Sequence, residues 1–110
     1  MHPEIKVWLK DIQLSINEIY EFLPLPRKYI LFQKDLKTRK AIERNIEIIG
    51  EAVNRIIRKD KNFKLENAQK IIGTRNRIVH GYDKISDELI WSIVINDIPR
   101  LKDEIAELLK

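Results

Sequence analysis

The apolar residues of this chain recur at every third or fourth position along most of its 110 residues. That spacing places them on one face of an α-helix, whereas a half-buried strand would alternate apolar and polar residues. The pattern covers residues 3–23, 32–59, 65–80 and about 87–108, and no stretch shows a strand pattern or an internal repeat. The sequence therefore predicts an all-α fold, folded as a single domain over residues 1–110.

Residues that commonly end or begin helices stand at the edges of these segments. Pro24 ends the first segment, because its ring and missing amide forbid continuation. Gly81 follows the third segment, where the chain is expected to turn left-handed, and Ser86 or Asp87 is expected to cap the fourth. The apolar stripe of the fourth segment continues through Pro99, which leaves one kinked helix or two nearly collinear helices as alternatives.

A few side chains on these predicted helices mark particular environments. Trp8 and Trp91 lie on the buried stripes and are expected in the core. Asn45 falls inside the apolar sector of residues 32–59, so its amide is expected to be buried and hydrogen-bonded. Val7 and Leu14 form a small apolar patch on the opposite face of the first helix.

A ladder of carboxylates follows one face of the second predicted helix. Glu43, Glu47 and Glu51 stand at four-residue steps, where like charges repel. We expect a cationic group opposite them, either Arg75 or Arg77 from the third helix or a partner surface. A solvated face is the alternative.

The charge balance permits nucleic-acid binding but does not require it. The net charge is +4 at pH 7, and six basic residues against one acidic residue occupy positions 27–40. Such a cluster is either a solvated surface or an electrostatic footprint for a phosphate backbone.

Composition also bears on metal sites and cellular location. With no cysteine, the chain has neither disulfides nor thiolate metal sites. No apolar run is long enough to span a bilayer, and the first residues lack a secretory pattern. We expect a cytoplasmic protein without a membrane association, a bound metal or a cofactor.

The segment Arg75-Asn76-Arg77-Ile78-Val79-His80-Gly81-Tyr82 gathers groups suited to phosphodiester chemistry without a metal. Arg75 can hold a phosphate, His80 can move a proton near neutral pH, and Tyr82 adds a hydroxyl. Asn76 precedes His80 by four residues, so on a helix it shares a face with the imidazole and can fix its tautomer. The alternative is that His80 only complements the dipole at a helix end.

The spacing of Arg75, His80 and Tyr82 resembles the R-x-x-x-x-H-x-Y motif of the HepT-like toxins, a branch of the HEPN ribonuclease superfamily. The resemblance extends to most of the chain, because residues 35–38 and 41–52 resemble the long second helix of that family.

Two further segments resemble the family, and one departs from it. Residues 8–12 resemble its opening, and Trp91 resembles part of its fourth helix. Residues 67–69 lack a tryptophan that members often carry early in the third helix, which affects local packing rather than the site.

This resemblance implies an antiparallel bundle of four to five helices that forms a homodimer, with the two motifs facing a shared cleft. It also implies a metal-independent endoribonuclease toxin of a type II-like toxin–antitoxin pair, acting on RNA. The implied partner is a small nucleotidyltransferase antitoxin of the MntA type, which can adenylylate the motif tyrosine, here Tyr82.

The chemistry of these residues agrees with that function. Cleaving RNA without a metal needs a base, an acid and positive charge at the phosphate. One chain offers a single competent histidine, whereas a two-fold dimer brings two to one cleft. We expect His80 to carry protons, Arg75 to hold the phosphate and Asn76 to orient the imidazole. Tyr82 is expected to contact the substrate or to accept the modification.

Two other functions remain open from the sequence. One is a catalytically silent HEPN module that binds nucleotide or regulates a nucleotidyltransferase, against which the intact Arg75 and His80 argue. The other is a helical interaction protein whose glutamate ladder contacts a basic partner. A neighbouring gene for a nucleotidyltransferase would favour the toxin pair over this last reading.

Overall fold

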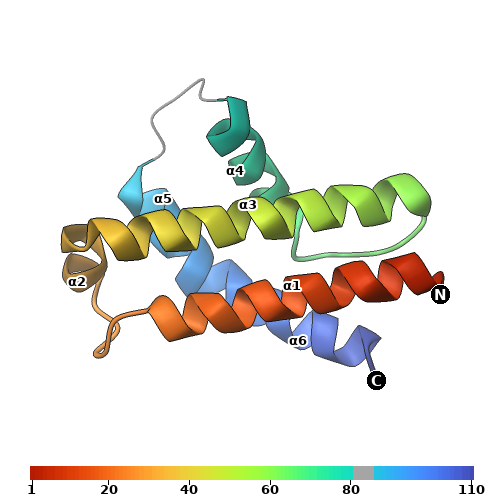
Figure 1. Cartoon of the computed structure of the whole chain (residues 1–110), viewed down its shortest axis with the longest axis horizontal. Helices are drawn as coiled ribbons and strands as arrows, with labels where there is room; N and C mark the ends of the chain where they lie inside the picture. The colour runs from red at the N-terminus through yellow and green to blue at the C-terminus, as the bar shows by residue number, and fades with distance from the viewer. Residues whose placement is uncertain (81–85) are drawn as a thin grey trace.

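The computed structural model describes residues 1–80 and 86–110, and its elements in these ranges are helices without any strand (Figure 1). In chain order they are α1 (Pro3–Phe22), α2 (Tyr29–Lys34), α3 (Leu36–Lys59), α4 (Gln69–His80), α5 (Asp87–Ser92), the π-helical segment η1 (Ile93–Asp97) and α6 (Ile98–Leu108). None of the helices in these ranges is long and apolar enough to cross a membrane.

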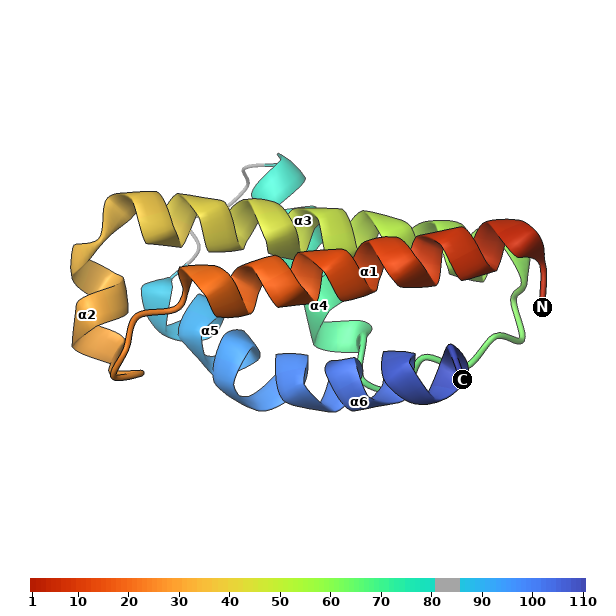
Figure 2. The same cartoon turned by 60° about the horizontal axis from the view of Figure 1, so that its bottom comes forward.

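The two long helices α1 and α3 lie side by side and run in opposite directions (Figures 1 and 2). The path from α5 to α6 runs beneath them, and α4 packs against α3 on the side away from α1. The first and last residues lie at the same end of the molecule (Figure 2). The prediction of an all-α antiparallel bundle is therefore confirmed.

Isoleucine dominates the core between these helices. The predicted stripes supply fully buried side chains from α1, α3 and the C-terminal helices, among them Ile12, Ile16, Ile46, Ile49, Ile90 and Ile105. Burying one such side chain stabilises the fold by about 1.5–3 kcal/mol. Trp8 and Trp91, expected in the core, are half-buried at its edge and pack against it.

The periodicity predicted one unbroken helix over residues 32–59, but the structure divides this range between α2 and α3. The backbone is extended at Asp35, with φ −104° and ψ 97°, so α2 ends before it and α3 begins after it. The Asp35 carboxylate accepts hydrogen bonds from the Thr38 amide at 3.2 Å and from the Thr38 hydroxyl at 2.8 Å. These bonds, chiefly the one from the hydroxyl, lower the pKa of Asp35. Asp35 therefore caps α3 by satisfying an amide that has no partner within the helix.

The third helix begins at Gln69 rather than at residue 65. The preceding turn is held by Glu104 of α6, whose carboxylate accepts the amide of Glu66 at 2.8 Å and the amide of Asn67 at 3.2 Å. Leu65 and Ala68 are buried, so the apolar spacing continues although the backbone there is not helical. The prediction failed because buried residues in a turn mimicked a helical stripe.

The π-helical segment η1 lies between α5 and α6 and accommodates Pro99, the second residue of α6. The Ile98 amide donates to the Ile93 carbonyl, five residues earlier, and the path bends at this segment (Figure 2). In a regular helix the proline ring would clash with the carbonyl of Ile95, and the wider π turn relieves that contact. Of the two alternatives for this segment, the structure shows the bent path, with the bend just before the proline.

Two local predictions also have clear outcomes. Ser86 caps α5, because its hydroxyl accepts the Leu89 amide at 3.1 Å. Asn45 is buried, and its side-chain nitrogen donates to the Ala41 carbonyl at 3.1 Å. The predicted turn at Gly81 lies outside the described residues.

Candidate functional site

Helix α4 carries the predicted site. Arg75 and Asn76 lie in its second half, and its backbone continues to His80. The side chain of His80 and the whole of Tyr82 lie outside what the structure describes. The expected bond between Asn76 and His80 and the placement of Tyr82 therefore stay predictions.

The approach of α4 to α3 depends on Gly50. A Cβ atom at Gly50 would stand 2.4 Å from the Arg75 Cβ and 2.8 Å from the Arg75 Cγ. It would also lie 3.4 Å from the Ile71 carbonyl oxygen. Carbon atoms pack best at about 3.5–4.0 Å, so any side chain at this position would push the two helices apart. Glycine in a helix interior costs about 0.5–1 kcal/mol relative to alanine, and here it permits the contact with Arg75.

Gly73 of α4 has a different environment. It is exposed, and a Cβ atom there would meet nothing within 4 Å. The two helical glycines therefore differ in function, since only Gly50 makes room for a neighbouring helix.

The Arg75 side chain is held at its base and at its tip. Its first carbons pack on Gly50, and its Nη1 donates to the Asn76 side-chain oxygen at 3.0 Å. Its Nε is buried, and no acceptor for its N–H is recorded in the described part of the chain. Constraints at both ends reduce the number of positions that the guanidinium can adopt before a substrate arrives.

The contact between Arg75 and Asn76 was not predicted. Neighbouring residues on a helix project about 100° apart and do not face each other. The long arginine side chain reaches round the helix to make this bond, which no residue spacing could reveal. It uses one of the two lone pairs of the Asn76 oxygen, and the second lone pair and the amide nitrogen stay available for an imidazole.

The contribution of Gly50 was also missed from the sequence. The signal was present, because an isolated glycine inside a strongly periodic helix often marks close packing. What the sequence lacks is the identity of the residue packed against it, which only the arrangement of α3 and α4 reveals.

Each glutamate of the ladder forms an ion pair with a cation of its own helix. The recorded ion pairs are Glu43 with Lys40 at 3.6 Å, Glu47 with Arg44 at 3.3 Å and Glu51 with Arg55 at 2.7 Å. These are spacings of three or four residues along α3, where opposite charges offset the repulsion between the glutamates. In the described ranges, no group of three His, Cys, Asp or Glu side chains is arranged to hold a metal ion.

Known proteins similar to this chain are ribonucleases by name. The family model "Ribonuclease HepT-like" matches residues 12–108. "Putative RNase MJ1380" of Methanocaldococcus jannaschii is 36% identical, covering 93% of this chain and 94% of the relative. "Probable ribonuclease HepT" of Thermococcus cleftensis is 33% identical, covering 96% of each chain. No solved structure gives a significant match. Because the family model and these relatives span almost all of its length, the chain belongs to the HepT-like ribonuclease family.

Proposed function

We propose that this protein is a metal-independent endoribonuclease whose site forms between the α4 helices of a homodimer. The observation that carries the proposal is the constrained Arg75 guanidinium, on the same helix whose backbone ends at His80. Membership of the HepT-like family supports RNA as the substrate. The relatives' names support the same activity.

In the proposed reaction, the ribose 2′-oxygen attacks the adjacent phosphorus while the bond from phosphorus to the 5′-oxygen breaks. A neutral His80 takes the proton of the 2′-hydroxyl, and a protonated His80 gives one to the leaving 5′-oxygen. The products are a 2′,3′-cyclic phosphate and a 5′-hydroxyl. Arg75 stabilises the negative charge that accumulates on the phosphate oxygens.

The two histidine roles are the reason for proposing a homodimer. His2, the other histidine of the chain, is exposed next to the first residue. A two-fold axis near α4 would bring two copies of His80 and two of Arg75 to one cleft, because such an interface uses the same patch twice.

A direct test is cleavage of total RNA and tRNA by the purified protein in EDTA. We expect cleavage to persist in the chelator and to leave cyclic phosphate ends or their opened products, because both proton transfers are assigned to His80. End-group analysis of the fragments checks this. Activity that disappears in EDTA and returns with a divalent ion would contradict the mechanism. A protein that cleaves neither RNA under any condition would favour the catalytically silent alternative.

Regulation by a partner nucleotidyltransferase is part of the proposal. The resemblance to toxins of this type suggests that the partner transfers adenylate to Tyr82, two residues after His80. The added phosphate would compete with RNA for the Arg75 guanidinium, and the adenosine would obstruct the cleft. The proposed compartment is the cytoplasm, where RNA and nucleotide substrates are both available.

We expect co-expression with a neighbouring nucleotidyltransferase to add one adenylate to Tyr82 and to silence cleavage. Tyr82→Phe keeps the ring, so it should retain much of the activity and escape silencing. Intact-mass and peptide mass spectrometry measure the modification. Tyr29 is the internal control, because its hydroxyl is buried and its ring packs 6.1 Å from that of Trp91. Adenylate that is absent, or that maps only to Tyr20 or Tyr29, would overturn this regulation without affecting the nuclease assignment.

A further inference from the structure

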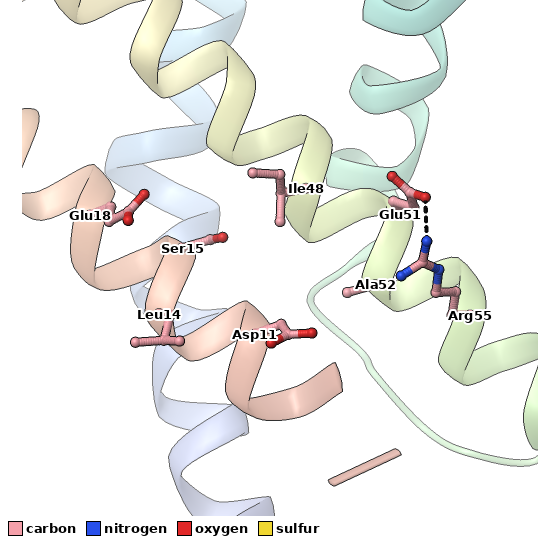
Figure 3. Close-up of a pocket in the computed structure, with 8 residues that line it drawn as sticks. All are labelled: Asp11, Leu14, Ser15, Glu18, Ile48, Glu51, Ala52 and Arg55. Carbon is pink, nitrogen blue, oxygen red and sulfur yellow. Dashed lines mark hydrogen bonds and ion pairs between the residues drawn. The ribbon is translucent and has the colours of Figure 1, made fainter. Parts of the chain in front are cut away.

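A groove of about 250 Å³ lies between α1 and α3 (Figure 3). Helix α4 packs on the other side of α3 (Figure 1). The groove is therefore separate from the proposed nuclease site. The residues that line it are Asp11, Leu14, Ser15 and Glu18 of α1 and Ile48, Glu51, Ala52 and Arg55 of α3.

The groove is acidic, although the protein as a whole is basic. Asp11, Glu18 and Glu51 line it, together with one cation, Arg55. Arg55 is already paired, because its Nη2 lies 2.7 Å from the Glu51 carboxylate. No ion pair is recorded for Asp11 or Glu18 in the described ranges, so two carboxylates remain uncompensated on a chain of net charge +4.

A serine hydroxyl points into the same space. Ser15 is only 5% exposed, and its side chain projects from α1 toward α3 (Figure 3). No hydrogen bond of this hydroxyl is recorded within residues 1–80 and 86–110. The Ser15 oxygen is not among the buried unpaired side-chain atoms of these residues, so it reaches the open side of the groove, where it can bind an entering polar group.

Apolar side chains complete the groove. Leu14 is 63% exposed beside Ser15, and Ile48 lies half-buried on the α3 side. Val7, one heptad before Leu14, is also exposed and extends the apolar strip along α1. An arginine side chain matches this combination, since its carbon stem packs on apolar surface while its guanidinium binds carboxylates and a hydroxyl.

We propose that this groove is a docking site for a basic amphipathic segment of a partner protein, which inserts an arginine between Asp11, Glu18 and the Ser15 hydroxyl. RNA does not fit, because its phosphates would face the carboxylates. Two copies of the groove facing each other do not fit either, because each is lined by three carboxylates and one cation. The proposal is independent of the nuclease assignment.

The probe is a synthetic helical peptide of leucine, alanine and arginine, compared with a version in which citrulline replaces each arginine. Citrulline keeps the shape of the side chain but removes its charge. We expect the arginine peptide to shift backbone amide resonances of residues 11–18 and 48–55 in NMR titrations, and the citrulline peptide to bind much more weakly. Added salt should weaken the binding, because the charged contacts are exposed.

The variant that tests the groove is Asp11→Asn with Glu18→Gln, which removes both uncompensated charges and changes little else. We expect it to weaken peptide binding by roughly five- to tenfold, from two exposed charge contacts. Asp103→Asn with Glu21→Gln makes the same chemical change at exposed sites that do not line the groove, and it should bind as the unmodified protein does.

Three results would overturn the proposal. The first is equal peptide affinity of the groove variant and its matched control. The second is a set of shifted amides that lies away from the groove. The third is a shift of the groove amides caused by an RNA oligonucleotide, or by raising the protein concentration without peptide, which would assign the surface to RNA or to a second copy.

Discussion

Replacing Arg75 or His80 by alanine is expected to lower the rate of RNA cleavage by roughly a hundredfold or more, the usual scale for losing a charge stabiliser or a proton carrier. Without Arg75, the charge on the phosphate oxygens loses its guanidinium. Without His80, neither proton transfer has a carrier. The measurement is the initial cleavage rate in EDTA at equal protein concentration.

Both variants are expected to remain folded, because neither residue belongs to an apolar stripe of the core. Arg58→Ala is a suitable control, since Arg58 is an exposed arginine in the last turn of α3. It should cleave at the unmodified rate. A rate for Arg75→Ala or His80→Ala within a few-fold of the unmodified protein would remove that residue from the proposed mechanism.

The same two variants test the shared cleft. Light scattering should first give a mass of twice the 13.1 kDa chain, and a mass near that of one chain would contradict the dimer. A mixed dimer of an unmodified subunit with a His80→Ala subunit keeps one of the two imidazoles, and one with an Arg75→Ala subunit keeps one of the two guanidiniums. If both imidazoles act in one cleft, the first mixed dimer should retain far less than half of the unmodified activity. Activity equal to the average of the parents would mean that each motif works by itself.

Replacing Gly50 by alanine is expected to reduce cleavage by roughly ten- to a hundredfold, because a misplacement of about 1 Å in a catalytic group has effects of this size. The new methyl group would stand 2.4 Å from the Arg75 Cβ, so α4 must move away from α3 and take the guanidinium with it. Overpacking of this kind also destabilises the fold by about 1–3 kcal/mol. Cleavage should therefore be measured well below the unfolding midpoint, with thermal unfolding followed in parallel.

Gly73→Ala is the matched control, because it makes the same change in open space on α4. It should stabilise the protein by about 0.5–1 kcal/mol, through the better helix propensity of alanine, whereas Gly50→Ala should destabilise it. If Gly50→Ala is destabilised but cleaves at the unmodified rate, the contact supports the fold and does not position Arg75.

The sequence predicted the helical class and the buried faces well, because both depend on local spacing. Ile46 and Ile49, for example, are buried because they lie on the apolar stripe of α3 that faces the core. The break at Asp35 was less visible, because the apolar pattern continues across it to Phe32. The pair formed by Asp35 and Thr38 is typical of a helix cap, and it is the signal that was missed in the sequence.

For the candidate site, the sequence placed Arg75, Asn76 and His80 on one helix, as observed for the backbone. It did not predict that Gly50 lies against Arg75, because that contact joins residues 25 positions apart on two helices. Nor did it predict that Asn76 binds Arg75, since the spacing of the residues favoured His80 instead. Helical periodicity reports which face is buried, but not which residues of two helices meet.

The hydrogen bonds from Glu66 and Asn67 to Glu104 make the start of α4 dependent on a residue of the last helix, α6. A chain shortened within α6, or one with a different residue at position 104, would keep all the motif residues. It would still lose the hydrogen bonds that hold the turn before α4. Intact motif residues are thus an incomplete criterion for activity among relatives of this protein. A homologue that lacks an acidic side chain at the equivalent position needs another way to hold this turn.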